Sequence, residues 1–136
     1  MDKLKMLFVD DRSKRIHAAL NQYGEKYDVT IAPSVKEALR AISQTDFDVI
    51  SLDHDLNGDD YQDSDDRTSG MEIIRFITEY GWPKAKVPSF IIHTSNAFAG
   101  QQMYNKLRHM GLTANTIPFS YDGAAYARGI VRKLST

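Results

Sequence analysis

Short apolar runs alternate with longer amphipathic stretches along the whole chain. Each short run has the length of a strand, and each longer stretch repeats apolar residues at the three- and four-residue spacing of a helix with one buried face. The five expected strands cover residues 5–9, 27–32, 47–52, 87–92 and 116–119. Because a helical pattern follows every strand, the chain is expected to form an α/β fold built on a parallel sheet.

The segments between the strands carry the start and stop signals of helices. In the first of them, Ile16, Leu20 and Tyr23 form the expected buried face, and a glycine follows. Later helix starts are marked by side chains that can cap a helix, namely the capping-box pairs Ser34–Glu37 and Ser69–Glu72 and the single residues Asn96 and Asp122. These signals predict one helix of ordinary length after each strand.

The order of these elements leaves few topologies, since crossovers between parallel strands are right-handed. We expect one domain over residues 1–136, with a flavodoxin-like, three-layer (βα)₅ fold and a parallel five-stranded sheet in the strand order 2-1-3-4-5. In such a sheet, ligands bind beyond the carboxyl ends of the strands, where the strand order reverses. That point lies between the first and third strands, so the residues just after these strands are the first candidates for a site.

Composition narrows the class of protein further. Hydrophobic residues make up 42% of the 136, which indicates a packed domain, and the lack of cysteine excludes disulfides, thiolate nucleophiles and cysteine-ligated zinc. The formal net charge of -1 does not favour the binding of nucleic acid through overall charge. An RNA partner therefore has to be bound by a local group of side chains. No segment has the pattern of a signal peptide or a membrane span, so we expect a soluble, cytoplasmic protein.

Acidic residues follow two of the strands that meet at the reversal point. Asp10 and Asp11 come directly after the first strand, and Asp53 and Asp55 follow the third. Clustered carboxylates need a counter-charge, and a hard divalent cation such as Mg²⁺ prefers oxygen ligands. The four aspartates are therefore the candidate metal ligands, although each of them alone would be an ordinary loop or capping residue.

Two histidines occur at the same strand ends. His54 lies between the two aspartates after the third strand, and His93 directly follows the fourth. An unperturbed imidazole titrates near pH ~6.5, so two of them can divide acid and base work. We expect His54, His93 and Asp53 to be catalytic, without assigning which imidazole is the acid. The polar residues after His93 stand at a helix start and are candidates for binding phosphate, namely Thr94, Ser95 and Asn96.

The aspartate pair, Asp53 and the (βα)₅ plan resemble the receiver domain of response regulators over nearly the whole chain. The resemblance implies that Asp10, Asp11 and Asp53 bind Mg²⁺ and that Asp53 accepts a phosphoryl group from a histidine kinase. Two positions depart from the receiver pattern. His93 stands where receivers place Ser or Thr, and Ile117 stands where they place the Lys that stabilises the phosphorylated aspartate.

A receiver-like family found among phage and bacterial proteins fits these residues better. The chain resembles the cyclic-phosphate processing receiver domains in an Arg close behind the aspartate pair (Arg12 or Arg15), in residues 52–56, in Ser69-Gly70 and in residues 93–96. This resemblance implies a role in RNA end repair, acting on a 2′,3′-cyclic phosphate at an RNA terminus or on a cyclic nucleotide. In that reaction the two histidines would exchange protons, while the aspartates hold a divalent cation or orient the imidazoles.

Other interpretations stay open from the sequence. Besides a cyclic phosphodiesterase or phosphohydrolase, the chain fits a divergent receiver that binds Mg²⁺ and is phosphorylated on Asp53, or a non-catalytic signalling or interaction module. Residues 53–58 match the first half of an EF-hand calcium loop, but position twelve is Ser64 rather than Glu. Basic pairs such as Lys14-Arg15 are interpreted as surface charges. No residue decides the oligomeric state.

Overall fold

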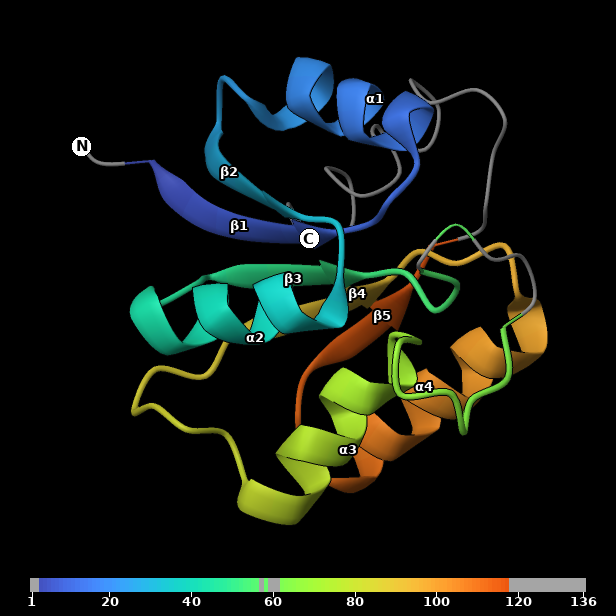
Figure 1. Cartoon of the computed structure of the whole chain (residues 1–136). Helices are drawn as coiled ribbons and strands as arrows, with labels where there is room; N and C mark the ends of the chain where they lie inside the picture. The colour runs from blue at the N-terminus through green and yellow to red at the C-terminus, as the bar shows by residue number, and fades with distance from the viewer. Residues whose placement is uncertain (1–2, 57, 59–61, 118–136) are drawn as a thin grey trace.

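The computed structural model describes residues 3–56, 58 and 62–117, which contain five strands and four helices (Figure 1). In chain order the elements are β1 (Leu4–Val9), α1 (Ser13–Tyr23), β2 (Tyr27–Ala32), α2 (Val35–Gln44), β3 (Val49–Leu52), α3 (Met71–Tyr80), β4 (Ser89–Ile92), α4 (Ala97–His109) and β5 (Ala114–Thr116). The helix expected after Asp122 lies outside the described residues. None of the described helices is long and apolar enough to cross a membrane.

The five strands are parallel and lie in the order β2-β1-β3-β4-β5, which confirms the expected topology. The order reverses between β1 and β3, as predicted. The register places Val9 beside Leu52, and Leu52 beside Ile92. The residues that follow these three positions therefore leave the sheet at the same level and at the same edge.

Helices cover both faces of the sheet, so the three-layer arrangement is also confirmed. Figure 1 shows α1 on one face and α2, α3 and α4 on the other. Because successive side chains of a strand point to opposite faces, Leu7 and Ile50 belong to the core under α2, α3 and α4, whereas Met6 and Phe8 belong to the smaller core under α1. Both faces of the central strands are buried, which explains their near-continuous apolar sequences.

Some expected boundaries are correct and others are not. The Ser34 side chain accepts a hydrogen bond from the Glu37 backbone N–H and caps α2 as predicted. The predicted capping box at Ser69 is wrong, because Gly70 is the N-cap of α3 and the Glu72 N–H donates to the backbone oxygen of Ser69 instead. The strand expected at 116–119 begins earlier, since β5 pairs with β4 over 114–116.

Candidate active site

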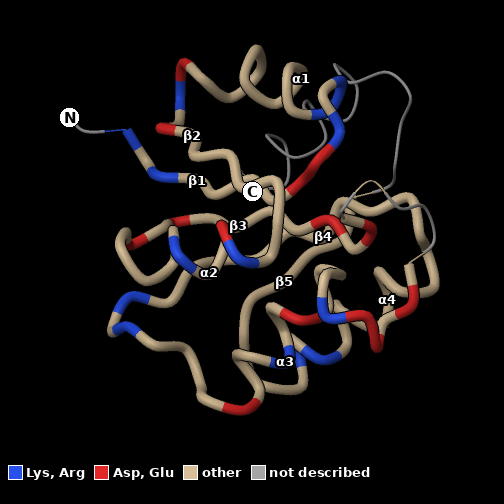
Figure 2. Tube along the Cα trace, in the orientation of Figure 1, with Lys and Arg blue, Asp and Glu red and all other residues tan. Residues whose placement is uncertain are grey.

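The residues that follow β1, β3 and β4 meet at one edge of the sheet. Figure 2 shows the acidic segments after β1 and β3 at the same end of the molecule, beside the basic start of α1. Asp10, Asp53 and His93 are each almost completely buried at this edge. Buried ionisable groups need partners, so the contacts among these side chains determine what the site can do.

His93 connects β4 to β1 and β3. Its Nε2 atom lies 3.0 Å from Asp10 Oδ2, and its Nδ1 atom lies 2.5 Å from Ser51 Oγ. The ring also stacks flat on Phe8, with centroids 4.5 Å apart. The imidazole is thus fixed in one plane with both ring nitrogens within hydrogen-bonding distance of a partner.

Arg15 brings a positive charge to the same carboxylates, so its interpretation as a surface charge is wrong. Its Nε atom lies 3.1 Å from Asp10 Oδ2, and its Nη2 atom lies 3.3 Å from Asp53 Oδ2. The residue is only 8% exposed, while Leu20, which was expected to face the core, is 40% exposed. Helix α1 therefore turns Arg15, Ala19 and Tyr23 inward, because pairing the guanidinium with two buried carboxylates offsets the cost of burying all three charges.

Asp53 is held between positive and negative neighbours. Its Oδ1 atom accepts a hydrogen bond from the backbone N–H of His54, at 2.8 Å. Burial, followed by repulsion from Asp10, raises the pKa of Asp53 to about 6, although the charges of His93 and Arg15 and a hydrogen bond from Thr94 act in the opposite direction. This carboxyl group can therefore hold or release a proton near neutral pH.

Three of the four predicted metal ligands form a group that could hold a cation. Asp10, Asp11 and Asp53 each offer an oxygen, and these atoms lie within 4.8 Å of one another. Asp11 Oδ1 is buried and has no hydrogen-bond partner among the described residues, which suits a cation ligand. The donor set fits Mg²⁺, but Arg15 already pairs with both Asp10 and Asp53, so an ion has to compete with the guanidinium.

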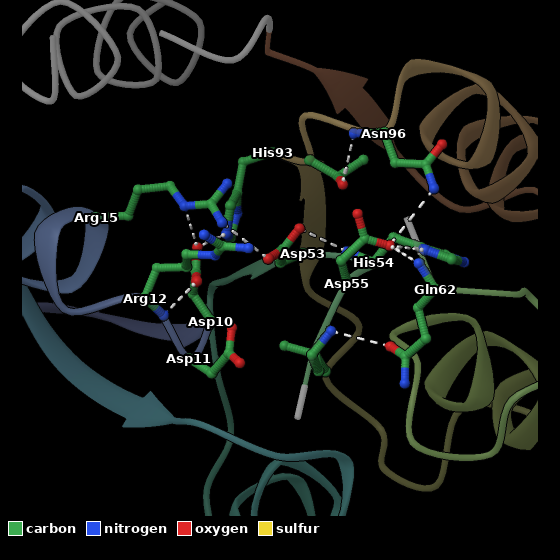
Figure 3. A network of polar contacts seen from close by, with 12 residues as sticks. Asp10, Asp11, Arg12, Arg15, Asp53, His54, Asp55, Gln62, His93 and Asn96 are labelled. Atoms are coloured by element: carbon green, nitrogen blue, oxygen red, sulfur yellow. Dashed lines mark hydrogen bonds and ion pairs between the residues drawn. The ribbon is translucent and has the colours of Figure 1, made fainter. Parts of the chain in front are cut away.

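Asp55 and His54 belong to a second network on the other side of Asp53 (Figure 3). His54 Nδ1 lies 2.8 Å from Asp55 Oδ1, and Nε2 lies 3.0 Å from Ser64 Oγ. The same Asp55 oxygen accepts hydrogen bonds from the Gln62 backbone N–H at 2.8 Å and from the Asn96 side chain at 3.4 Å. Asp55 therefore joins the end of β3 to the following loop and to the start of α4, apart from the group that could hold a cation.

The three predicted phosphate-binding residues lie between β4 and α4 with different exposures. Thr94 is buried, and its hydroxyl accepts a hydrogen bond from the Asn96 backbone N–H at 3.1 Å. Asn96 caps α4 as predicted, since its side chain accepts from the Ala99 N–H at 3.2 Å. Ser95 is exposed. Only the Thr94 side chain reaches Asp53 among the contacts described for these three residues.

The backbone of α3 also approaches the site closely. The Gly70 N–H donates to the backbone oxygen of His54, at 2.8 Å. A Cβ atom added at Gly70 would lie 1.9 Å from the backbone oxygen of Asp53. Glycine at this position therefore lets the start of α3 pack directly against the strand end that carries Asp53 and His54.

Sequence reasoning missed several partners of the predicted residues. Ser51 lies inside an apolar strand, and a polar residue at a position buried on both faces was the available signal. Arg15 was named beside Arg12 in the family resemblance, but its pairing with Asp10 and Asp53 was not predicted. Gln62 and Ser64 lie in an acidic loop whose composition does not distinguish them from solvated residues.

As far as the structure describes it, up to residue 117, the end of β5 contributes no charge to the site. Ile117 is buried and belongs to the core under α1, together with Met6 and Phe8. The residue that stands in place of the receiver lysine is therefore an apolar core residue in the structure as well. In the described part of the chain, Arg15 of α1 places a positive charge against Asp53.

Solved structures confirm the fold. The chain is similar to a CheY-like receiver domain from Methanospirillum hungatei, with 19% identity and a TM-score of 0.69 over 98% of this chain and 95% of that one. It is also similar to the HemR receiver domain from Leptospira biflexa, with 20% identity and a TM-score of 0.69 over 98% and 96% of the two chains. CheY4 of Vibrio cholerae matches with 17% identity and a TM-score of 0.68 over 96% and 98%. At these identities the likeness concerns the fold alone.

Comparison with protein families gives a more specific result. The pattern of the cyclic-phosphate processing receiver domain matches residues 5–109, from β1 to the last residue of α4. This match includes all three strand ends that build the site. No curated protein matches the chain significantly.

Proposed function

Because the chain belongs to the cyclic-phosphate processing receiver domain family, we propose that it binds 2′,3′-cyclic phosphates at RNA ends and opens them by hydrolysis. The observation that carries this proposal is the position of Arg15, 3.1 Å from Asp10 and 3.3 Å from Asp53. Opening a cyclic phosphodiester requires a cation for the phosphorane charge and a group that exchanges protons near neutral pH. Arg15 and Asp53 meet these two requirements at the reversal point of the sheet.

In the proposed reaction, a water oxygen bonds to phosphorus, the bond from phosphorus to one ribose oxygen breaks, and that oxygen takes up a proton. The product is a 2′- or 3′-phosphate monoester. The phosphate draws the Arg15 guanidinium away from Asp53, since Arg binds phosphate oxygens in pairs. Asp53 is then uncovered. As a carboxylate it takes the proton that the attacking water loses, and as the resulting carboxylic acid it gives that proton to the leaving ribose oxygen.

The two imidazoles do not contact the phosphate in this proposal, and each supports the reaction by pairing with a carboxylate. Both are buried, and both ring nitrogens of each have a partner within 3.0 Å. His93 acts through Asp10, whereas His54 orients Asp55, which accepts a hydrogen bond from the phosphate-binding candidate Asn96. Thr94, Ser95 and Asn96 supply hydroxyl, amide and helix N-terminal N–H groups for the phosphate oxygens.

A divalent cation fits the same site when Arg15 has moved. Asp10, Asp11 and Asp53 would hold it. Bound there, Mg²⁺ would withdraw negative charge from the phosphate. The roles proposed for Arg15 and Asp53 do not depend on it.

The test is hydrolysis of 2′,3′-cyclic AMP, with the products separated by chromatography, with and without Mg²⁺. Asp53→Asn and Arg15→Gln are expected to lower kcat/KM by about 100-fold or more. Lys14→Gln, which removes the neighbouring exposed cation of α1, is the matched control and is expected to keep full activity. Absence of turnover by the wild-type protein, or equal turnover by all variants, would refute the proposed reaction at this site.

A divergent receiver is the second candidate function. It is supported by the fold and by the position of Asp53 beside Asp10 and Asp11. In this proposal a histidine kinase phosphorylates Asp53, and Arg15 replaces the missing lysine. Beryllofluoride with Mg²⁺ would then shift the NMR signals of residues around Asp53, and no such shift would occur in Asp53→Asn.

A further inference from the structure

A pocket adjoins the acidic site on the side of α4. Its volume is about 330 Å³, at the lower end of the range for small-molecule sites. The described residues that line it come from the end of β4, the first turns of α4 and the end of β5, and they are Ile92, Thr94, Ser95, Ala97, Gly100, Gln101, Thr116 and Ile117. None of these residues is charged, so the pocket suits a neutral, partly apolar group better than a phosphate.

Thr94 is the wall shared by the pocket and the acidic site. Its side chain lines the pocket and also hydrogen-bonds to Asp53. A molecule whose phosphate lies at Asp53 and Arg15 would therefore reach the pocket with the part attached to that phosphate. In a 2′,3′-cyclic nucleotide this part is the nucleoside.

An exposed aromatic residue of α4 follows a residue that lines the pocket. Phe98 is 76% exposed, although it is a large apolar residue in the first turn of α4. It follows the lining residue Ala97 and precedes the lining residue Gln101 by three positions, which makes Phe98 and Gln101 neighbours on the helix surface. Exposed aromatic rings beside a phosphate site are typical platforms for unstacked RNA bases.

We propose that this pocket is a nucleoside subsite, in which the base of the terminal nucleotide stacks on Phe98 and lies against the apolar wall formed by Ile92 and Ile117. The inference rests on the proposed function, because the phosphate at Asp53 and Arg15 sets where the nucleoside lies. Gln101 and Thr116 stand at the polar edge and contact the base or the ribose. The site therefore recognises a nucleotide rather than a cyclic phosphate alone.

The test compares the binding of two ligands by calorimetry. One is 2′,3′-cyclic AMP, and the other is the 2,3-cyclic phosphate of 1-O-methyl-ribofuranose, which has the same phosphate and sugar but no base. Wild-type protein is expected to bind the nucleotide about tenfold more tightly, in line with the contribution of one stacked base. Phe98→Ala is expected to remove this difference and to leave the affinity for the baseless ligand unchanged.

Tyr80→Ala is the matched control. Tyr80 is another exposed aromatic residue, 68% exposed, at the end of α3 and away from the pocket lining. Its removal is expected to change neither affinity. Both substitutions alter exposed side chains, so the fold is retained, and circular dichroism checks this.

The outcomes separate the two proposals. Equal binding of both ligands by wild-type protein, or an equal loss of nucleotide affinity in Phe98→Ala and Tyr80→Ala, refutes the nucleoside subsite but leaves the cyclic-phosphate function standing. A Phe98→Ala variant that changes the oligomeric state and keeps its nucleotide affinity refutes the subsite and identifies Phe98 as a protein contact. Binding of neither ligand by wild-type protein refutes both proposals.

Discussion

The Nε2 atom of His93 lies 3.0 Å from Oδ2 of Asp10, although 83 positions separate the two residues in the chain. The contact joins the end of β4 to the end of β1 across the intervening end of β3. Arg15 approaches the same Asp10 oxygen, with its Nε atom at 3.1 Å. The ring and the carboxylate belong to one buried polar network. Removing either of them takes a hydrogen-bond partner from the other.

Replacing His93 should therefore affect both stability and activity. His93→Ala is expected to lower the free energy of unfolding by about 3 kcal/mol, because it creates a cavity beside Phe8 and removes a partner from Asp10 and Ser51. His17→Ala, at an exposed position of α1, is the control and should cost less than about 1 kcal/mol. Urea denaturation measures both. Similar values for the two variants would show that the His93 contacts contribute little.

The raised pKa of Asp53 predicts a specific pH dependence of stability. The folded pKa of about 6 exceeds the ordinary value of 3.8, so the folded state binds the proton more tightly than the unfolded state. The contribution of Asp53 to the stability of the folded state is therefore fully present below about pH 4 and is lost as the pH rises through about 6. Above that pH the ionised carboxylate costs roughly 3 kcal/mol relative to acid conditions.

Asp53→Asn tests this dependence because asparagine does not ionise. The difference in unfolding free energy between the variant and the wild-type protein should shift in favour of the variant between pH 4 and pH 6 and stay constant above. Denaturation at a series of pH values measures this difference, in which the other titrating groups largely cancel. A difference that does not vary over this range would mean that the pKa of Asp53 is not raised.

Competition between Arg15 and a divalent cation predicts the effect of removing the guanidinium. Arg15→Met is expected to bind Mg²⁺ at least about tenfold more tightly than the wild-type protein, since Asp10 and Asp53 lose their internal counter-charge. Lys14→Met removes an exposed charge from the same helix and should change the affinity by less than about threefold, because solvent screens it. Calorimetric titration with MgCl₂ gives both constants. Equal affinities in the Arg15 and Lys14 variants would argue against competition.

Two adjacent residues at the start of α3 should respond to alanine in opposite directions. Gly70→Ala places a Cβ atom 1.9 Å from the backbone oxygen of Asp53, so α3 has to move, and the expected loss of stability is about 3 kcal/mol or more. Ser69→Ala removes a buried hydroxyl that has no partner among the described residues, and it should be neutral or stabilising by about 1 kcal/mol. Thermal unfolding distinguishes the two. A stable Gly70→Ala variant would contradict the close approach of α3 to Asp53.

The sequence by itself determined the architecture. Strand-like and helix-like patterns of apolar residues alternate along the chain, and few folds are compatible with this alternation. The runs around Leu7, Ile50 and Phe90 predicted three buried strands, and the order 2-1-3-4-5 was the leading choice among the few topologies that right-handed crossovers leave. The same order predicted that Asp10, Asp53 and His93 would meet. It succeeded because parallel strands in register end at one edge, so position in the chain is sufficient to place the residue that follows each strand.

Only the tertiary structure decided which polar groups pair with one another. The two histidines were expected to divide the acid and base work, and the structure adds their partners: His93 pairs with Asp10, and His54 pairs with Asp55 and Ser64. Arg15 was expected at the surface, yet it lies between two buried carboxylates. Hydrophobic periodicity is a property of neighbouring residues and can be read along the chain. The pairing of buried charges depends on distances of a few ångströms between segments far apart in sequence, and these distances exist only once the helices have packed on the sheet.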